Sequence, residues 1–454
     1  MKKINNMQES SFLKLFFLFI SFCFLIAAPI MPDRAELFSD LKTILFSTCK
    51  ISTNYFSFGY AATFLNMGLV GLICTALCCL PGAKPNNVTT LGVLLTVGFA
   101  SWGMNPVNMI PTILGVLLYC LVKKEKPGAM SNAMLFSTGI APLISDLLFR
   151  YPYAEPVVGF HGLGFILAIF VGLIIGFFLP AGLAHAPNVH KGYDHYSAAL
   201  PIGMTAFFLR AVLFTVMGVA LPKPDSTLPA AASWPIVNIF CGVVFGLCVI
   251  IALLMGCKVK DYWNLMKDSG HGVSFTTKYG NAAFLMNAGI FGLFILGYYN
   301  LVSAIDTSGN AASATGMTFG IIFCMLATCN SGSHPRNVLP IMVGYVIASY
   351  LFGWLYGLLG VGEAFKLTIG AQGIMIGLCY ANGLSPISGK YGFGYGVLAG
   401  ILHYLLVTAV PDMHGGFLLY NGGFTAALIC LMLVPQLEKF CKTKEERKLS
   451  KVGK

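Results

Sequence analysis

Long apolar stretches, separated by short polar segments, recur from one end of the chain to the other. Ten of them are long enough to cross a hydrocarbon core of about 30 Å as helices. They cover residues 12–30, 58–80, 129–149, 159–184, 196–221, 234–256, 280–299, 367–385, 391–410 and 417–434. The pattern predicts an all-α polytopic membrane protein with about ten transmembrane helices.

Two further apolar stretches are each interrupted by Gly, Pro and Asn. The first consists of residues 88–101 and 109–122, and the second of residues 314–329 and 338–359. Because two prolines and a glycine stop a helix, we expect each stretch to form a broken-helix hairpin that leaves the membrane by the side it entered. The alternative is one re-entrant piece followed by one full crossing.

The chain contains two copies of one sequence pattern, in the same order. FGYAATFLNMGLVGL at 58–72 matches YGNAAFLMNAGIFGL at 279–293, and G-x-x-P-x-N-x-x-P-x-x-x-G begins at both Gly103 and Gly332. A third block pairs 139–142 with 383–386, and a fourth pairs 187–196 with 411–420. A duplication therefore predicts a first membrane repeat at 1–222, a second at 223–437 and a basic tail at 438–454. The apolar stretch at 11–30 pairs with 234–255, so we interpret it as a retained helix.

The basic residues test the orientation of the repeats. Five crossings per repeat place the second repeat upside down relative to the first. With the N-terminus inside, 19 basic residues are cytoplasmic: Lys2, Lys3, Lys84, Lys123, Lys124, Lys126, Lys191, Lys258, Lys260, Lys267, Lys278, Lys390 and the seven of the tail. Six are outside: Arg34, Lys42, Lys50, Arg150, Lys223 and Lys366. Because Lys and Arg favour the cytoplasmic side, this split predicts inverted repeats in the cell membrane, with both termini cytoplasmic.

Composition excludes a soluble globular enzyme. Of the 454 residues 57% are hydrophobic and only 10% are charged, whereas an ordinary soluble domain carries about 25% charged residues. The net charge of +11 is spread over short loops and the tail, which indicates topology and contact with membrane lipids rather than nucleic-acid binding. The 14 cysteines lie mostly in apolar spans, without zinc spacing, so neither a metal nor a cofactor is expected.

The hairpins are the first candidates for a solute pathway. Interrupted helices expose backbone N–H and C=O groups at membrane depth, and these groups must line a cavity or be buried in protein. Pro106, Asn108, Pro335 and Asn337 would supply such groups, together with Gly103 and Gly332. The alternative is that both asparagines only cap the breaks.

Other intramembrane polar residues have similarly divided interpretations. Asn66 and Asn287 stand beside small residues, which suits either helix packing or substrate contact. The second hairpin carries His334 and Arg336 where the first carries Asn105 and Val107. The second hairpin is therefore the more polar one, which favours an anion or a polar solute.

The fourth block supplies candidates for gating or for the membrane interface, namely His190, His414, Tyr196 and Tyr420. Arg210 is an intramembrane charge that should face a partner or water, and Asp146 is a possible partner. His403 lies within a span and is interpreted as a neutral core histidine. No catalytic motif is present, so no enzymatic activity is expected.

The duplicated F/Y-G-x-x-A, G-x-x-P-x-N-x-x-P and H-x-G-F/Y blocks resemble a family of duplicated bacterial integral membrane proteins of unknown function. The five spans plus a hairpin in each inverted half are also similar to the architecture of urea transporters, although the pore motifs of that family have no copy here. The leading hypothesis is a transporter or channel for a small polar solute, with its route between the repeats. The alternatives are a membrane scaffold or sensor and an enzyme acting on a lipid-linked substrate. The sequence is compatible with a homo-oligomer and does not decide the oligomeric state.

Overall fold

The protein is described by a computed structural model that covers residues 2–48, 53–150, 159–218, 232–306, 313–360 and 365–452. The boundary predicted between the repeats at 222 and the basic residues Lys50, Lys223 and Lys454 lie outside the described residues. Every regular element in the described part of the chain is helical, and none is a strand.

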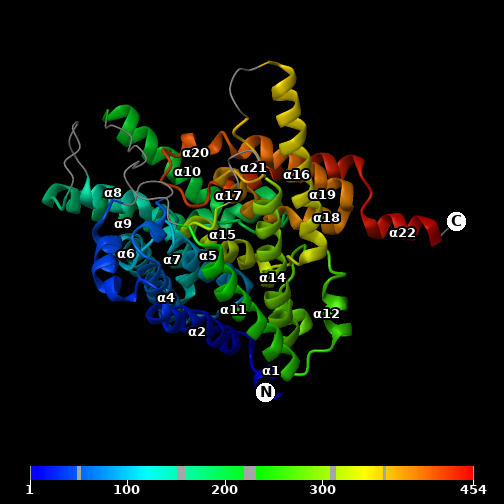
Figure 1. Cartoon of the computed structure of the whole chain (residues 1–454), viewed down its shortest axis with the longest axis horizontal. Helices are drawn as coiled ribbons and strands as arrows, with labels where there is room; N and C mark the ends of the chain where they lie inside the picture. The colour runs from blue at the N-terminus through cyan, green and yellow to red at the C-terminus, as the bar shows by residue number, and fades with distance from the viewer. Residues whose placement is uncertain are drawn as a thin grey trace.

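The helices of the two repeats follow the same order (Figure 1). The first repeat contains α1 (Lys2–Asn5), α2 (Glu9–Ala27), η1 (Ala28–Ile30), η2 (Arg34–Glu36), α3 (Leu37–Phe46), η3 (Tyr55–Ser57), α4 (Tyr60–Leu77), α5 (Asn87–Phe99), α6 (Pro106–Lys123), η4 (Pro127–Met130), α7 (Ser131–Ser137), η5 (Thr138–Ile140), α8 (Ala141–Phe149), α9 (Gly162–His190), α10 (Ala199–Arg210) and the π-helical η6 (Ala211–Val216). The second contains α11 (Trp234–Leu254), α12 (Val259–Leu265), α13 (Phe275–Tyr279), α14 (Asn281–Ile305), α15 (Gly316–Leu326), η7 (Ala327–Asn330), α16 (Pro335–Leu358), α17 (Gln372–Ala381), η8 (Asn382–Leu384), α18 (Ser385–Tyr391), α19 (Phe393–Val407), α20 (Val410–Met413) and α21 (Asn421–Phe440), followed by α22 (Lys444–Val452).

Ten helical runs are long and apolar enough to cross a membrane, which confirms the predicted number. They are Glu9–Ile30, Tyr60–Leu77, Pro106–Lys123, Pro127–Phe149, Gly162–His190, Ala199–Val216, Trp234–Leu254, Asn281–Ile305, Pro335–Leu358 and Asn421–Lys451. The set differs from the predicted one because α6 and α16 belong to it, whereas α17–α18 and α19 do not. The second arms of the hairpins, α6 and α16, have 18 and 24 residues, long enough to cross. In contrast, the 3₁₀ break Asn382–Leu384 divides α17 from α18, and α19 has only 15 residues.

The two arms of each hairpin have unequal lengths. The first arms are α5, with 13 residues, and α15–η7, with 11 and four. At 1.5 Å per residue these arms reach about 20 Å, which is too short to cross a hydrocarbon core. The arms α5 and α15 pack against each other at the centre of the molecule, where Gly98 and Gly320 let their backbones approach closely. They run antiparallel, since Ser101 Oγ donates to the Gly316 carbonyl and Asn330 Nδ2 donates to Thr90 Oγ1.

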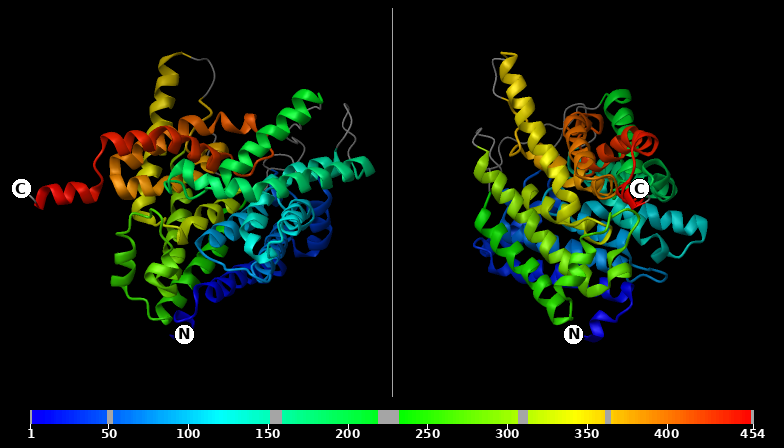
Figure 2. Two further views of the ribbon diagram at one scale, coloured as in Figure 1. Left: turned by 180° about the vertical axis from the view of Figure 1, so that it is seen from behind. Right: turned by 90° about the vertical axis from the view of Figure 1, so that its right-hand side faces the viewer.

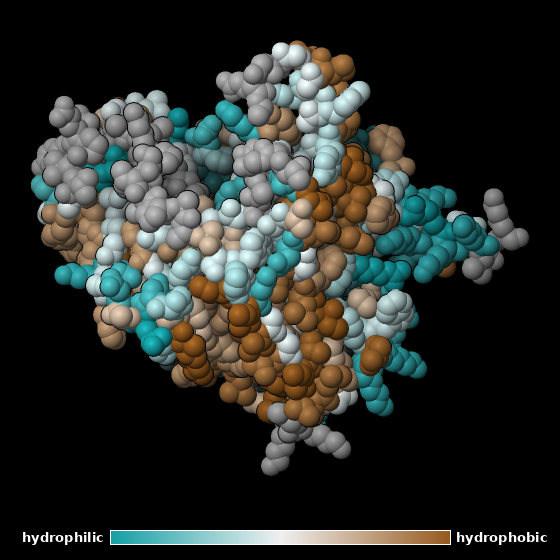
Figure 3. Space-filling model, in the orientation of Figure 1, coloured by the Kyte–Doolittle hydropathy of each residue, from teal (hydrophilic) through white to brown (hydrophobic). Residues whose placement is uncertain are grey.

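Equivalent helices pair in the same way in both repeats. Helix α2 packs on α4 as α11 packs on α14, and α6 packs on α9 as α16 packs on α19. Where the repeats meet, Phe24 of α2 contacts the rings of Phe64, Phe240 and Phe323. The N-terminal apolar stretch is thus part of the folded core. Apolar side chains cover the surface over α2 and α11, and polar ones gather at α12 and α22 (Figure 3).

Segments predicted on the same side of the membrane lie at the same end of the molecule. At one end the N-terminal segment contacts α14, Asn87 contacts the Val273 carbonyl, and α22 extends outward from α18 (Figure 2). At the other end Asn105 bonds to the Ile44 carbonyl and Phe46 contacts Phe149. This separation agrees with five crossings and a hairpin in each repeat. Which end faces the cytoplasm stays a prediction.

Candidate functional site

The tip of the first hairpin is a closed hydrogen-bonded turn that caps α6. Asn105 Oδ1 accepts from the Asn108 N–H at 3.0 Å, and Asn108 Oδ1 accepts from the Asn105 N–H at 2.9 Å. The Asn108 amide nitrogen donates to the Gly103 carbonyl and to Ser145 Oγ. Pro106 stands at the first position of the helix, where its missing N–H costs nothing. Asn108 therefore caps the break, and its place in a solute pathway stays a prediction.

The second hairpin tip repeats this geometry. Asn337 Oδ1 accepts from the His334 N–H at 3.0 Å, and its amide nitrogen donates to the Gly332 carbonyl at 2.9 Å. Pro335 begins α16 as Pro106 begins α6, and the side chain of Arg336 is exposed. The two tips do not meet. They lie at opposite ends of the α5–α15 pair, so Asn108 and Asn337 do not share one site.

Asn66 and Asn287 brace the hairpins from neighbouring helices. Each side-chain amide donates to two buried carbonyl oxygens, one at the end of the first arm and one at the tip. The acceptors are Ala100 and Met104 for Asn66, and Cys329 and Ser333 for Asn287, at 2.6–2.9 Å. The symmetry of these bonds agrees with the helix-packing interpretation of both asparagines. Contact with a substrate stays a prediction.

The loop that follows α9, and its counterpart before α21, each lie against the other repeat. The His195 N–H donates to the Gly383 carbonyl at 3.1 Å, and the Leu419 N–H donates to the Gly139 carbonyl at 2.9 Å. Both glycines belong to the 3₁₀ breaks η8 and η5. The ring of Tyr196 covers Gly383 and the ring of Tyr420 covers Gly139 so closely that a Cβ atom at either glycine would overlap the ring. Each repeat thus completes the broken helix of the other.

The two histidines of the fourth block brace these loops. His190 Nε2 lies 2.8 Å from Ser197 Oγ, and His414 Nδ1 lies 2.7 Å from Asn421 Oδ1. Each bond closes the loop around its buried tyrosine. A gating role for His190, His414, Tyr196 and Tyr420 stays a prediction.

The two loop contacts differ sharply in polarity. We call the contact of the first loop with the second repeat the polar junction: Asp194, His195, Tyr196, Ser333, Asn382 and Ser385. Its counterpart is the apolar junction, in which the repeat alignment places Leu418, Leu419, Tyr420, Met104, Thr138 and Ala141 at the same positions. At four aligned positions, the polar junction therefore has a polar residue where the apolar junction has an apolar one.

Hydrogen bonds connect the polar junction. Ser385 Oγ lies 3.0 Å from Ser333 Oγ and 3.3 Å from His195 Nε2. The Tyr196 hydroxyl lies 2.8 Å from Asn382 Oδ1 and also faces two helix carbonyl oxygens, those of Cys324 and Cys379. These contacts join the hairpin tip, the break and the loop in one polar network.

Asp194 is the buried acid of the polar junction. Its residue is 2% exposed, and Oδ1 accepts from the Tyr196 N–H at 2.9 Å. Oδ2 has no hydrogen-bond partner among the described residues. Burial raises the pKa of Asp194 to about 7, against the smaller lowering effect of the Tyr196 N–H. The carboxyl group can therefore gain or lose a proton near neutral pH.

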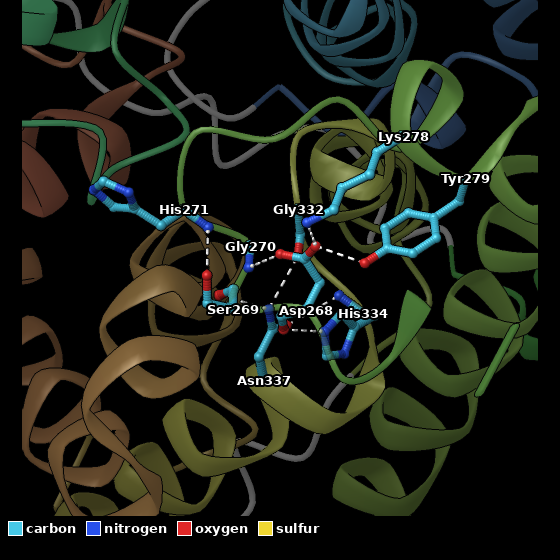
Figure 4. Close-up of polar contacts among 9 residues, drawn as sticks. All are labelled: Asp268, Ser269, Gly270, His271, Lys278, Tyr279, Gly332, His334 and Asn337. Atoms are coloured by element: carbon cyan, nitrogen blue, oxygen red, sulfur yellow. Dashed lines mark hydrogen bonds and ion pairs between the residues drawn. The ribbon is translucent and has the colours of Figure 1, made fainter. Parts of the chain in front are cut away.

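A short loop, residues 268–271, covers the second hairpin tip (Figure 4). His334 Nε2 lies 3.1 Å from the Asp268 carbonyl oxygen, and the backbones of Gly270 and Gly332 touch. The Asp268 carboxylate accepts from Lys278 at 2.6 Å and from the Tyr279 hydroxyl at 2.7 Å. Burial alone would raise the pKa of Asp268, but hydrogen bonds from Lys278, the Gly270 N–H and Tyr279 outweigh it and hold the pKa below its ordinary value.

A basic pocket of about 350 Å³ opens on the other side of this loop. Five lysines and two acids line it, together with uncharged residues and His271; the charged residues are Lys267, Lys278, Lys390, Lys444, Lys448, Asp268 and Glu445. Loop 268–271 forms part of the pocket wall and also packs on the hairpin tip. It therefore separates the basic pocket from the polar junction.

Two charged residues are placed differently from the expectation. Asp146 does not pair with Arg210; it forms a buried ion pair with Arg150, one helical turn further along α8. Arg210 is half-exposed and donates to Thr215 Oγ1 at 3.3 Å. His403 lies in the core between Tyr345 and the Gly422 carbonyl, as predicted.

Sequence reasoning missed most of the polar junction. Asp194 and His195 lie inside the fourth repeat block, where Leu418 and Leu419 stand in the other copy. The signal was this mismatch within an otherwise matched block. Among the described residues, no group of three or more His, Cys, Asp and Glu side chains could hold a metal ion.

Comparison with known proteins identifies a family without assigning an activity. A family model described as protein of unknown function (DUF1576) matches the chain twice, at residues 33–215 and 255–439. The two matches fall one on each repeat and agree with the predicted duplication. No curated protein and no solved structure matches the chain. Because the matches cover most of its length, the chain belongs to this duplicated family of unknown function.

Proposed function

We propose that the protein transports a small polar solute across the cell membrane, along a route between the inverted repeats that passes through the polar junction. The observation that carries this proposal is the difference in polarity between the two junctions. A purely structural contact has no need of a buried acid, a histidine and two serines, because the apolar junction makes the same backbone bonds with leucine, methionine and alanine.

The helix breaks support the same route. A hairpin tip and the break η8 bring interrupted helices together beside Asp194 and His195, deep within the repeat interface. Interrupted helices at membrane depth are typical of transporter binding sites, where they present polar groups to a solute. The route would run from the basic pocket through loop 268–271 to the polar junction, so movement of this loop would open it.

Flux into proteoliposomes tests the proposal. Purified protein is challenged with neutral solutes and organic anions, with and without sodium and proton gradients. Ser385→Ala installs the residue of the apolar junction, Ala141, and should lower flux by about tenfold, the effect of about one lost hydrogen bond. Ser137→Ala is the matched control, because among the described residues the Ser137 hydroxyl bonds only within its own broken helix, to the Met134 carbonyl.

Two results would contradict this function. Undiminished flux in both Ser385→Ala and His195→Leu would remove the polar junction from the route. Absence of protein-dependent flux under every gradient would leave the symmetric scaffold or sensor as the function. In that case Ser385→Ala would change only the thermal stability.

A further inference from the structure

We propose that the basic pocket is a binding site for a multiply charged anion that bears phosphate or carboxylate groups. The inference rests on the proposed function, since it makes such an anion the transported solute or a ligand at the mouth of its route. It goes further by naming the chemical class of the ligand and the residues that hold it.

An excess of positive charge is the main support, since five lysines line the pocket against the two acids Asp268 and Glu445. Of the five lysines in the pocket, Lys278 forms an ion pair, with Asp268. Within the described part of the chain, the ammonium groups of Lys267, Lys390, Lys444 and Lys448 form no ion pair with a carboxylate. Four cations around one concave site repel each other, and a bound anion removes this repulsion.

Neighbouring residues increase the positive potential. The charges of Arg336 and Arg447 act on Lys444 in addition to that of Lys448. Arg447 donates to the Tyr391 carbonyl, which holds α22 over the pocket. The lysines therefore come from four segments: the loop before α13, α13 itself, the end of α18, and α22. Their convergence in the fold, rather than their spacing in the sequence, creates the site.

The form of the pocket suits a small anion. Its volume of about 350 Å³ lies at the lower end of the range for small-molecule sites. Ammonium groups act as compact point charges that bind phosphate and carboxylate oxygens without demanding one orientation. The ligand would also meet His271, whose ring lies against Tyr193 at a centroid distance of 4.4 Å.

Loop 268–271 links anion binding in the basic pocket to the opening of the proposed solute route. The anion would compete with Asp268 for the ammonium group of Lys278, and this ion pair ties to α13 the loop that covers the hairpin tip. Occupation of the pocket would thus weaken the contact that closes the route. The link follows from one lysine serving both the pocket and the loop.

Binding of inorganic pyrophosphate to the full-length protein in phosphatidylcholine nanodiscs tests the inference by calorimetry. The variant Lys267→Gln, Lys390→Gln, Lys444→Gln removes three pocket charges and should weaken binding by about threefold per lysine. The matched control, Lys258→Gln, Lys260→Gln, Lys442→Gln, removes the same net charge from exposed lysines that do not line the pocket. It should leave the Kd within about twofold, since its charges are screened by salt.

A second arm distinguishes a soluble anion from a lipid headgroup. Nanodiscs containing phosphatidylglycerol are analysed for lipid that stays bound to the protein, with the same two variants. Pyrophosphate binding that the pocket variant weakens supports a soluble anion, and lysine-dependent lipid retention supports a headgroup. Equal effects of both triple variants, or neither kind of binding, would overturn the inference. The pocket variant should also unfold at a higher temperature than wild type, because it relieves repulsion.

Flux separates this inference from the proposed function. Pyrophosphate binding without transport of any solute would keep the anion site and reject the transport route. Transport of neutral solutes without lysine-dependent anion binding would keep the route and reject the anion site.

Discussion

The two buried tyrosines of the junctions offer a direct test of the polarity difference between the repeats. Tyr196 and Tyr420 occupy equivalent positions, cover equivalent glycines and are both about 1% exposed. The Tyr196 hydroxyl donates into a set of three acceptors, whereas the Tyr420 hydroxyl has no hydrogen-bond partner in the described structure. Tyr196→Phe and Tyr420→Phe remove the same atom from two symmetric environments.

The two variants should change the free energy of unfolding by different amounts. Tyr196→Phe leaves Asn382 Oδ1 buried without this donor, which costs about 1–3 kcal/mol of unfolding free energy. Tyr420→Phe removes a buried hydroxyl that makes no bond, so it should be neutral or stabilising by up to about 1 kcal/mol. The unfolding free energies of the two variants should therefore differ by about 1–4 kcal/mol. Packing of the ring does not contribute to this difference, because both variants keep the ring.

Equilibrium unfolding in mixed micelles measures this difference, with near-ultraviolet circular dichroism and intrinsic tryptophan fluorescence as independent probes. Coincident transitions from both probes are required before a free energy is taken from the curves. Thermal melts at fixed detergent concentration give the rank order of the two variants. Tyr196→Phe should melt below wild type, and Tyr420→Phe at or above it.

Equal destabilisation by the two variants would refute the reasoning. It would mean that the Tyr420 hydroxyl has a bonding partner in the membrane and that the two junctions are alike in polarity. The case for the polar junction as the functional one would then lose its main support.

Three further predictions follow from the internal symmetry and from burial. Asn66→Ala and Asn287→Ala should each lower the free energy of unfolding by about 2–4 kcal/mol, because each leaves two buried carbonyl oxygens without a donor. Thermal melts should show similar shifts for the two variants. A shift in only one variant would contradict the prediction. Gly332→Ala should destabilise more than Gly103→Ala, because Gly332 has φ +129° and touches the backbone of loop 268–271; unfolding midpoints decide the order. The Asp194 carboxyl should contribute a loss of about 2–3 kcal/mol of stability between pH 5 and pH 8, because it binds its proton more tightly in the folded state, with a pKa of about 7, than in the unfolded one. This loss is measured as the difference between the pH profiles of wild type and Asp194→Asn, and identical profiles would contradict the assignment.

The hairpin tips illustrate what a local pattern can predict. The bonds by which Asn108 caps α6 reach Asn105 and Gly103, both within five residues, so the motif already contains the information for the cap. The ion pair of Asp146 shows the same locality, since Arg150 lies one helical turn away and was overlooked in favour of a more distant partner. Local spacing was the better guide in both cases.

The polar junction was beyond the reach of local patterns. Loop residue His195 and Ser385 are 190 residues apart in the chain, and periodicity does not tell which loop meets which break. The sequence also did not tell which helices are long enough to cross, because the apolar pattern is the same for a short buried helix and for a crossing one. Within the repeats, the sequence signal at this site is that polar residues at 194–195 align with apolar residues at 418–419. This difference can be interpreted only when the contact between the loop and the break is known.

The crossed contacts between the repeats have a consequence for biogenesis. The break at Gly139 is covered by Tyr420, which the ribosome adds 281 residues later. At a synthesis rate of about 5–20 residues per second, the first half spends about 15–60 s in the membrane with an uncovered helix break. A half-length chain would expose this break permanently. Neither half can complete its fold alone, so early termination of translation would yield a substrate for quality-control proteases rather than a working half-protein.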